Sequence, residues 1–140
     1  MKIKAVIFDM DGLMIDTEKL LHRYWMQAAG EFGYAMSMDH LLQIRSLAPQ
    51  YARPKLKSIL GESFDYDKVR DRRRELMAEH VERYGIEKKK GLDELLDYLK
   101  DRKYPIAVAT ATDMERTQQY LTKIGKINYF DKIICGSMVK

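Results

Sequence analysis

Two aspartates, Asp9 and Asp11, stand directly after a short apolar run at residues 4–8. That run is β-branched and aromatic, which is typical of a strand buried in a sheet that is covered on both faces. Gly12 follows the aspartates and supplies the backbone freedom that a turn requires. Ligands of open α/β sheets bind outside the carboxyl ends of the strands, so we expect the chemistry of this chain at residues 9–12.

Two ionised carboxylates held close together are costly, because burial and mutual repulsion both oppose them. A hard divalent cation removes that cost, and Mg²⁺ prefers oxygen ligands. With the cation bound, Asp9 could attack phosphorus as a nucleophile, and Asp11 could protonate the leaving oxygen and later activate water. The alternative is a strand end with two solvated aspartates, and the two-residue spacing alone does not separate these interpretations.

A second candidate site follows another apolar run, at residues 106–110, which predicts a buried strand ending in Thr110. A helix is expected to begin at Asp113. The Thr110 hydroxyl, the N–H groups near Ala111 and Thr112 and the positive end of the helix dipole would together bind an anion. The alternative is that Thr112 or Asp113 only caps the helix, and both can hold. The predicted phosphate-binding set is Thr110, Ala111, Thr112 and Gly12.

The elements around these sites change character along the chain. Apolar residues at three- and four-residue spacing predict four successive helices at residues 18–88. From Leu92 onward, helices alternate with short apolar runs, the order of a parallel β–α–β unit with right-handed crossovers. We therefore predict an α/β fold: an incomplete Rossmann-like parallel-sheet core from residues 1–17 and 89–140, with an inserted α-helical cap at residues 18–88.

Composition narrows the class of protein. The 140 residues are 46% hydrophobic and 33% charged with both signs mixed, as expected of one folded domain. The net charge of +4 suits small anions, and the arginines at 70–74 alternate with acids as on a solvated, salt-bridged helix face, so we predict no nucleic-acid partner. One cysteine excludes an internal disulfide. Neither a long apolar run nor a signal peptide is evident, so we predict a cytoplasmic protein without a membrane partner.

The segment at residues 8–18, Phe-Asp-Met-Asp-Gly-Leu-Met-Ile-Asp-Thr-Glu, resembles the first motif of the haloacid-dehalogenase-like (HAD) superfamily. It is most similar to the branch that contains β-phosphoglucomutase and sugar-phosphate phosphatases. Residues 107–113 resemble the second motif, in which Thr110 would bind the transferred phosphoryl group. The resemblance implies that Asp9 is the nucleophile and Asp11 the acid/base. It also implies that Mg²⁺ is held by the Asp9 carboxylate and the Asp11 main-chain carbonyl.

The same resemblance implies that the helical insertion is a mobile cap. Residues 15–17 and 86–90 would be its two hinge strands, and closure would exclude water from the phosphoaspartate. Arg45 lies between the second and third cap helices, where relatives often present a basic residue to the substrate. The alternative for Arg45 is an ordinary solvated arginine.

The sequence departs from the family pattern in three places. Leu21 stands ten residues after Asp11, where many relatives have histidine, and Pro49 stands near the place of a further cap arginine. The lysine and acidic pair that the family has after the third strand are not found, since Lys140 matches by spacing a residue a few positions earlier. We expect the N-terminal part of a phosphatase acting on a small phosphorylated metabolite. The alternatives are a phosphomutase of the β-phosphoglucomutase type, or an inactive fragment that binds or forms homo-oligomers through an exposed sheet edge.

Overall fold

The structure is a computed structural model that describes residues 2–138, so Lys140 lies outside the described residues. It divides into two compact units: a sheet unit, Met1–Glu18 with His80–Lys140, and a helical unit, Lys19–Glu79. The division falls within one continuous helix, α4 (Tyr66–Tyr84). The sequence prediction placed the end of the cap a few residues later, at residue 88.

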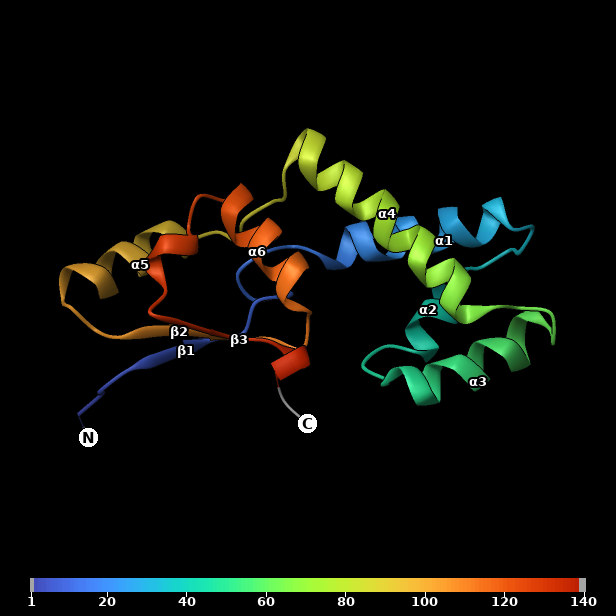
Figure 1. Ribbon diagram of the computed structural model, residues 1–140, viewed down its shortest axis with the longest axis horizontal. Coiled ribbons are helices and arrows are strands. Elements are labelled where there is room, and N and C mark those ends of the chain that lie inside the picture. The colour runs from blue at the N-terminus through green and yellow to red at the C-terminus, as the bar shows by residue number, and fades with distance from the viewer. Residues whose placement is uncertain (1, 139–140) are drawn as a thin grey trace. The chain divides into compact units, whose positions relative to one another are not determined.

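The sheet unit is built on three parallel strands, in the order β1 (Val6–Phe8), β2 (Ile106–Ala109) and β3 (Lys132–Ile134) (Figure 1). Helix α5 (Leu92–Asp101) leads into β2, and helix α6 (Met114–Lys123) connects β2 to β3. The predicted α/β core with parallel strands is confirmed. Because β2 lies in the centre, its carboxyl end stands beside the carboxyl end of β1, which brings the two predicted motif segments to the same edge of the sheet.

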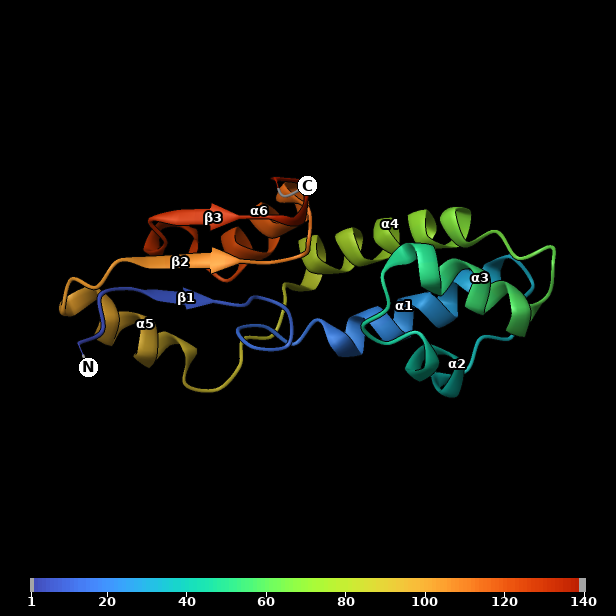
Figure 2. The same ribbon diagram turned by 90° about the horizontal axis from the view of Figure 1, so that it is seen from below.

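Helices α5 and α6 both lie on the same face of the sheet (Figures 1 and 2). Phe8, Ile106 and Val108 are buried, whereas Ile7 keeps 69% of its surface exposed. The prediction that β1 is covered on both faces is therefore wrong for the described residues. The physical reason is that two right-handed crossovers advancing in the same direction across a sheet place their helices on one face.

Two contacts near the chain's third strand hold the sheet in register. The Phe8 ring meets the Phe130 ring edge-on, with 6.2 Å between the centroids. The Asp131 carboxylate accepts a hydrogen bond of 2.8 Å from the Ile106 N–H, while the Asp131 N–H donates to the Ile106 carbonyl. Residues just before β3 thereby fix the start of β2.

The two segments predicted as hinge strands are hydrogen-bonded to each other. Ile15 and Lys88 form an antiparallel bridge, and the Asp16 N–H donates to the Glu87 carbonyl over 2.9 Å. The Lys88 ammonium also reaches the carboxylate of Asp93 at 2.9 Å, at the start of α5. The two predicted hinge segments therefore form an antiparallel pair within the sheet unit, and movement at this pair stays a prediction.

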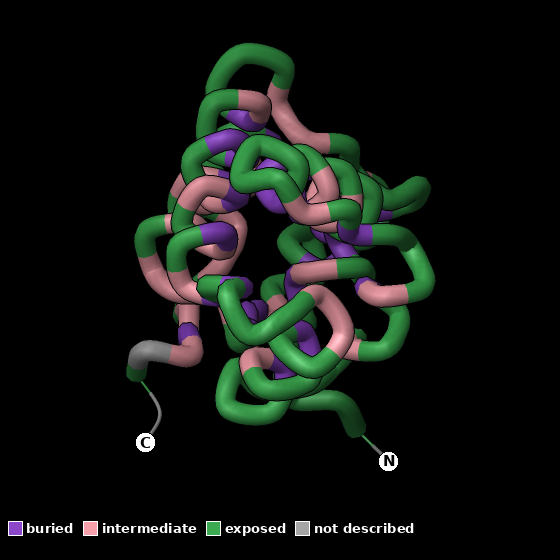
Figure 3. Tube along the Cα trace, turned by 90° about the vertical axis from the view of Figure 1, so that its right-hand side faces the viewer, coloured by how far each residue is buried: buried purple, intermediate pink, exposed green. Residues whose placement is uncertain are grey.

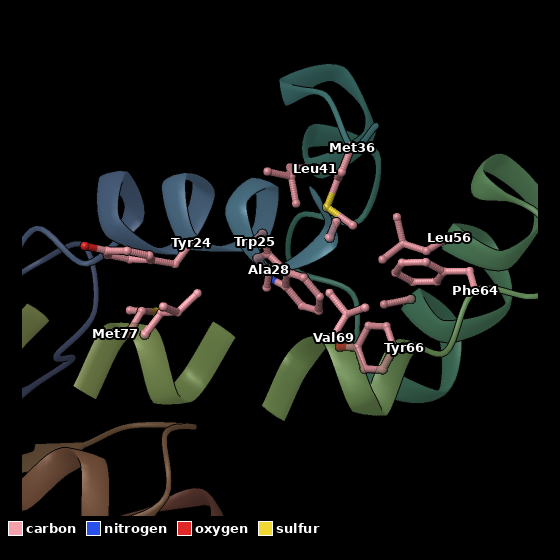
Figure 4. Close-up of a cluster of buried hydrophobic side chains, with 13 residues drawn as sticks. Tyr24, Trp25, Ala28, Met36, Leu41, Leu56, Phe64, Tyr66, Val69 and Met77 are labelled. Atoms are coloured by element: carbon pink, nitrogen blue, oxygen red, sulfur yellow. The ribbon is translucent and has the colours of Figure 1, made fainter. Parts of the chain in front are cut away.

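The helical unit contains α1 (Glu18–Glu31), α2 (Met38–Gln43), α3 (Pro49–Leu60) and most of α4, so the four predicted helices are confirmed. Ser37 caps α2 by accepting from the His40 N–H, and α3 ends at Gly61. Figure 4 shows the apolar side chains that these helices bury, among them Trp25 and Tyr66 with ring centroids 5.4 Å apart.

The predicted salt-bridged face of α4 is confirmed for two of its arginines. Arg72 pairs with Glu31 at 2.8 Å and Glu75 at 3.0 Å, and Arg70 pairs with acids on α4 itself. Arg73 differs: it is buried, with its guanidinium 4.9 Å from the centre of the Trp25 ring. Arg73 therefore belongs to the core of the helical unit, because an aromatic face attracts a cation.

Buried and exposed residues alternate along the α-helices, as one-sided packing requires. In Figure 3 short buried stretches alternate with exposed ones along the trace. No helix in the described part of the chain combines the length and the apolar character needed to cross a membrane.

Candidate active site

The turn after β1 is a compact loop anchored by buried apolar side chains. Met10, Met14 and Ile15 are almost fully buried, and the Met10 carbonyl accepts from the N–H groups of residues 13–15. The Gly12 N–H donates to the Ile15 carbonyl over 2.9 Å, and Gly12 has φ +80°. A positive φ is strained for residues with a Cβ, which explains the glycine directly after Asp11. Of the two aspartates at this turn, Asp9 is exposed and Asp11 is partly buried.

Asp9 is exposed and its carboxylate is only half engaged. One oxygen, Oδ1, accepts a hydrogen bond of 2.9 Å from the N–H of the next residue, Met10. Within the described part of the chain no donor is recorded for Oδ2. An exposed carboxylate oxygen of this kind is free to bind a cation or to approach an electrophile.

Asp11 is held by three threonine hydroxyls from two places in the sequence. Thr17 donates to Oδ1 over 2.9 Å, while Thr112 and Thr110 donate to Oδ2 over 2.7 and 3.3 Å. Three neutral hydroxyls therefore satisfy this carboxylate. Asp11 is the residue at which the turn after β1 and the end of β2 meet.

The predicted phosphate-binding segment lies beside Asp11, but its donors are arranged differently from the prediction. The Thr112 N–H donates to the Thr110 hydroxyl over 3.2 Å, so it is not a free helix-end donor. For the Ala111 N–H no partner is recorded among residues 2–138. Asp113, rather than Thr112, caps α6 by accepting from the Arg116 N–H over 3.0 Å. The capping alternative is therefore confirmed for Asp113, and anion binding by residues 110–112 stays a prediction.

Thr17 is the site residue that the sequence analysis missed. The sequence predicts it only as part of the hinge at residues 15–17, yet it is buried and its hydroxyl contacts Asp11. The available signal was the turn itself: the buried residues Met14 and Ile15 fold the chain back, so that a residue six positions after Asp11 can reach its carboxylate.

The oxygen atoms available as metal ligands at this site fit a hard cation better than a softer one. The free oxygen of Asp9 is a carboxylate oxygen, the ligand that Mg²⁺ takes from proteins together with water and phosphate oxygens. Among the residues that the structure describes, no group of three or more His, Cys, Asp or Glu side chains is arranged to hold a metal. The fit is thus to a cation held by one or two carboxylate or carbonyl oxygens.

A pocket of about 180 Å³ adjoins the same turn. It is bounded by Leu13 and Met14 of the turn, by Lys89 and Lys90, and by residues at the start of α5. Its walls are mainly apolar, and neither Asp9 nor Asp11 lines it. The two aspartates therefore lie outside this pocket.

Arg45, the predicted cap contact, lies in the helical unit, in the connection between α2 and α3 as expected. It is exposed and follows the last turn of α2. The other predicted site residues, Asp9, Asp11, Gly12 and residues 110–112, all belong to the sheet unit. A role for Arg45 in substrate binding stays a prediction.

The chain is similar to known proteins both in sequence and in structure. The family described as haloacid dehalogenase-like hydrolase matches residues 6–140. A Thermotoga maritima protein named "Phosphorylated carbohydrates phosphatase" is 27% identical over 143 residues, covering 99% of this chain. In structure, β-phosphoglucomutase from Clostridium difficile superposes with a TM-score of 0.76 at 18% identity, over 99% of this chain and 64% of its own. CbbY from Rhodobacter sphaeroides, in complex with phosphate, gives a TM-score of 0.79 at 20% identity over 99% and 65%.

The chain spans 63% of the length of the Thermotoga phosphatase. At identities of 18–20% the two structural likenesses show the fold.

Proposed function

The chain belongs to the haloacid dehalogenase-like hydrolases, and from this premise we propose that it acts in phosphate-ester hydrolysis through a covalent aspartyl-phosphate on Asp9. The observation that carries the proposal is the 2.7 Å hydrogen bond from Thr112 to Asp11. This hydrogen bond joins the turn that carries Asp9 and Asp11 to residues 110–112, whose hydroxyls stand at the start of a helix. Phosphoryl transfer needs both components, a carboxylate nucleophile with an acid and donors for the phosphoryl oxygens.

In the first step the free oxygen of Asp9 attacks phosphorus, and the bond between phosphorus and the ester oxygen breaks. Asp11, which must carry a proton in the complex with the ester, gives that proton to the leaving oxygen, so the alcohol departs neutral. In the second step Asp11 takes a proton from water, whose oxygen attacks the same phosphorus; the phosphorus–Asp9 oxygen bond breaks and inorganic phosphate leaves. Both carboxyl groups return to their starting state, as turnover requires.

Mg²⁺, when bound by the Asp9 carboxylate and the Asp11 carbonyl, would neutralise negative charge on the carboxylate and the phosphoryl oxygens. The hydroxyls of Thr110 and Thr112 would turn from Asp11 toward the phosphoryl oxygens. That exchange would leave Asp11 with the Thr17 hydroxyl alone and open its Oδ2 for proton transfer.

We propose a small phosphorylated carbohydrate as the substrate. The support is the name of the Thermotoga relative, a phosphatase of phosphorylated carbohydrates, which is 27% identical. We propose a phosphatase rather than a phosphomutase, which would transfer the phosphoryl group back to a sugar. The reason is that Leu21 and Pro49 stand where mutase-like relatives are expected to have other residues. Closure of the helical unit at the paired hinge segments would exclude bulk water while the ester is held.

The experiment measures hydrolysis by the 140-residue chain of p-nitrophenyl phosphate and of a panel of hexose and pentose phosphates, with Mg²⁺ or with EDTA. We expect Mg²⁺-dependent turnover that Asp9→Asn lowers by about 10³-fold or more, as loss of a nucleophile does. Asp101→Asn, which changes an exposed aspartate at the end of α5, is the matched control and should keep the activity. Turnover that survives Asp9→Asn or EDTA would contradict the mechanism, and no turnover of any ester would contradict the activity of this chain.

A further inference from the structure

Gly136 packs against the main chain of the predicted phosphate-binding segment. A Cβ added at Gly136 would lie 2.3 Å from the Ala111 carbonyl oxygen and 3.0 Å from the Ala111 carbonyl carbon. Both atoms belong to the backbone, so no side-chain rotation could relieve the contact. A methyl group at residue 136 therefore requires the backbone itself to move by about 1 Å to restore van der Waals distances.

This requirement for glycine is one of space and not of conformation. Gly136 is absent from the glycines with positive φ, a group that includes Gly12 and Gly125. An added Cβ at those two glycines meets no atom within 4 Å, as is also true of Gly30 in α1. Residue 136 must therefore be glycine because two backbone segments approach each other closely there.

The two segments are tied together on both sides of this contact. The Gly136 N–H donates to the Thr112 carbonyl over 3.3 Å, and the Thr110 N–H donates to the Ile134 carbonyl over 2.9 Å. Between them, Cys135 is fully buried with its Sγ 3.7 Å from the Met114 Sδ. The main chain of residues 134–136 is therefore hydrogen-bonded along the main chain of residues 110–112; we call this pair of segments the backbone frame.

The placement of Thr112 depends on this frame. Its carbonyl is held by Gly136, its N–H by the Thr110 hydroxyl, and its own hydroxyl donates to Asp11 over 2.7 Å. A displacement of Ala111 by about 1 Å would carry the Thr112 hydroxyl and N–H out of reach of their partners, because hydrogen bonds weaken steeply with distance and angle.

We propose that Gly136 is a positioning residue that sets the main chain of Ala111 and Thr112 for anion binding beside Asp11. The proposal rests on the proposed function, since it assigns residues 110–112 to the phosphoryl group. Gly136 itself touches no substrate. Its effect passes through the backbone of Ala111, and misplacement of a site by about 1 Å typically costs 10²-fold.

The test compares Gly136→Ala with Gly30→Ala, the same substitution at a helical glycine with open space around it. The probe is inorganic phosphate with Mg²⁺, followed by the amide resonances of residues 110–112 in ¹⁵N-labelled 140-residue chain. We expect the wild-type chain and Gly30→Ala to bind alike, and Gly136→Ala to bind roughly 10–100-fold more weakly with an unchanged far-ultraviolet circular dichroism spectrum. Equal phosphate affinity in all three would overturn the proposal.

Two further readouts separate this proposal from the proposed function. If the wild-type chain does not bind phosphate, the assigned function fails, and the Gly136 proposal is decided by the Thr112 amide resonance without ligand: it should shift in Gly136→Ala and not in Gly30→Ala. If Gly136→Ala does not fold, Asp11→Ala replaces it. Removing the acceptor of Thr112 should then speed hydrogen exchange at the Gly136 amide several-fold, and unchanged exchange would refute the coupling.

Discussion

The Thr112 hydroxyl donates to Asp11 Oδ2 over 2.7 Å, although 101 residues separate the two in sequence. The contact joins the carboxyl ends of β1 and β2, which are neighbours in the parallel sheet. It makes Asp11 the meeting point of the two segments that carry the proposed chemistry.

Thr112→Val should lower kcat/KM for p-nitrophenyl phosphate by roughly 10–100-fold, because a hydrogen bond to a charged group contributes about 1.5–3 kcal/mol. The matched variant Thr112→Ser keeps the hydroxyl and should stay within about threefold of the wild type. Steady-state kinetics of both variants check this. Wild-type kcat/KM in Thr112→Val would contradict the prediction, and a loss in Thr112→Ser alone would mean that the methyl group of Thr112 matters and its hydroxyl does not.

Thr17→Val should lower the free energy of unfolding by about 1–3 kcal/mol, because it removes a hydroxyl that a partly buried carboxylate uses while keeping the side-chain shape. Urea denaturation measures the change. The control is the same substitution in an Asp11→Ala background, where the hydrogen bond is already gone and the loss should be smaller. An identical loss in both backgrounds would show that Thr17 acts independently of Asp11.

Gly12→Ala should destabilise the chain by about 1–2 kcal/mol, the cost of holding a residue with a Cβ in the left-handed region. The backbone φ of Gly12 is +80° and the space around it is open, so the whole effect should come from conformation. Gly30→Ala, in a helix, should leave the free energy of unfolding unchanged or raise it slightly. If Gly12→Ala unfolds at the same urea concentration as the wild type, the turn does not require a positive φ.

Asp93→Asn should make the pH dependence of stability weaker on the acid side. Hydrogen bonds from Lys88 and then Lys126 hold the pKa of Asp93 below its ordinary value of 3.8. A lowered folded pKa means that the stabilisation is present above pH 3.8 and is lost as the pH falls through the folded pKa. The urea midpoint of Asp93→Asn should therefore lie below that of the wild type at neutral pH and meet it in acid.

The measurement is a series of urea midpoints for both proteins from pH 7 down to about pH 2.5, below the reference pKa of aspartate. Asp93 is partly exposed, so added salt should narrow the gap at pH 7 by screening both lysines. A gap of constant size across the whole pH range would show that the ion pairs do not contribute to stability.

Local patterns in the sequence were sufficient for much of the fold. Asp113 lies at the start of α6 as predicted, because a cap depends on hydrogen bonds within one turn of the same chain segment. The apolar runs at β1 and β2 mark strands for a similar local reason. Asp9 and Asp11 could be singled out because both stand at the end of one of these runs.

Other features needed the tertiary structure, since they depend on which segments become neighbours. The exposure of Ile7 follows from both crossover helices lying on one face of the sheet. Arg73 looked like its neighbours in the arginine-rich helix, yet it packs on Trp25 because its position on α4 faces the core of the helical unit.

By itself the sequence determined the parallel α/β core, the helical insertion and the pair of aspartates at the first turn, all of which are written in short-range periodicity and spacing. Only the tertiary structure decided that Thr17, Thr110 and Thr112 converge on Asp11 and that Gly136 presses on Ala111. Strand order and backbone packing bring these residues together from distant parts of the chain, and neither leaves a periodic signal in the residues concerned.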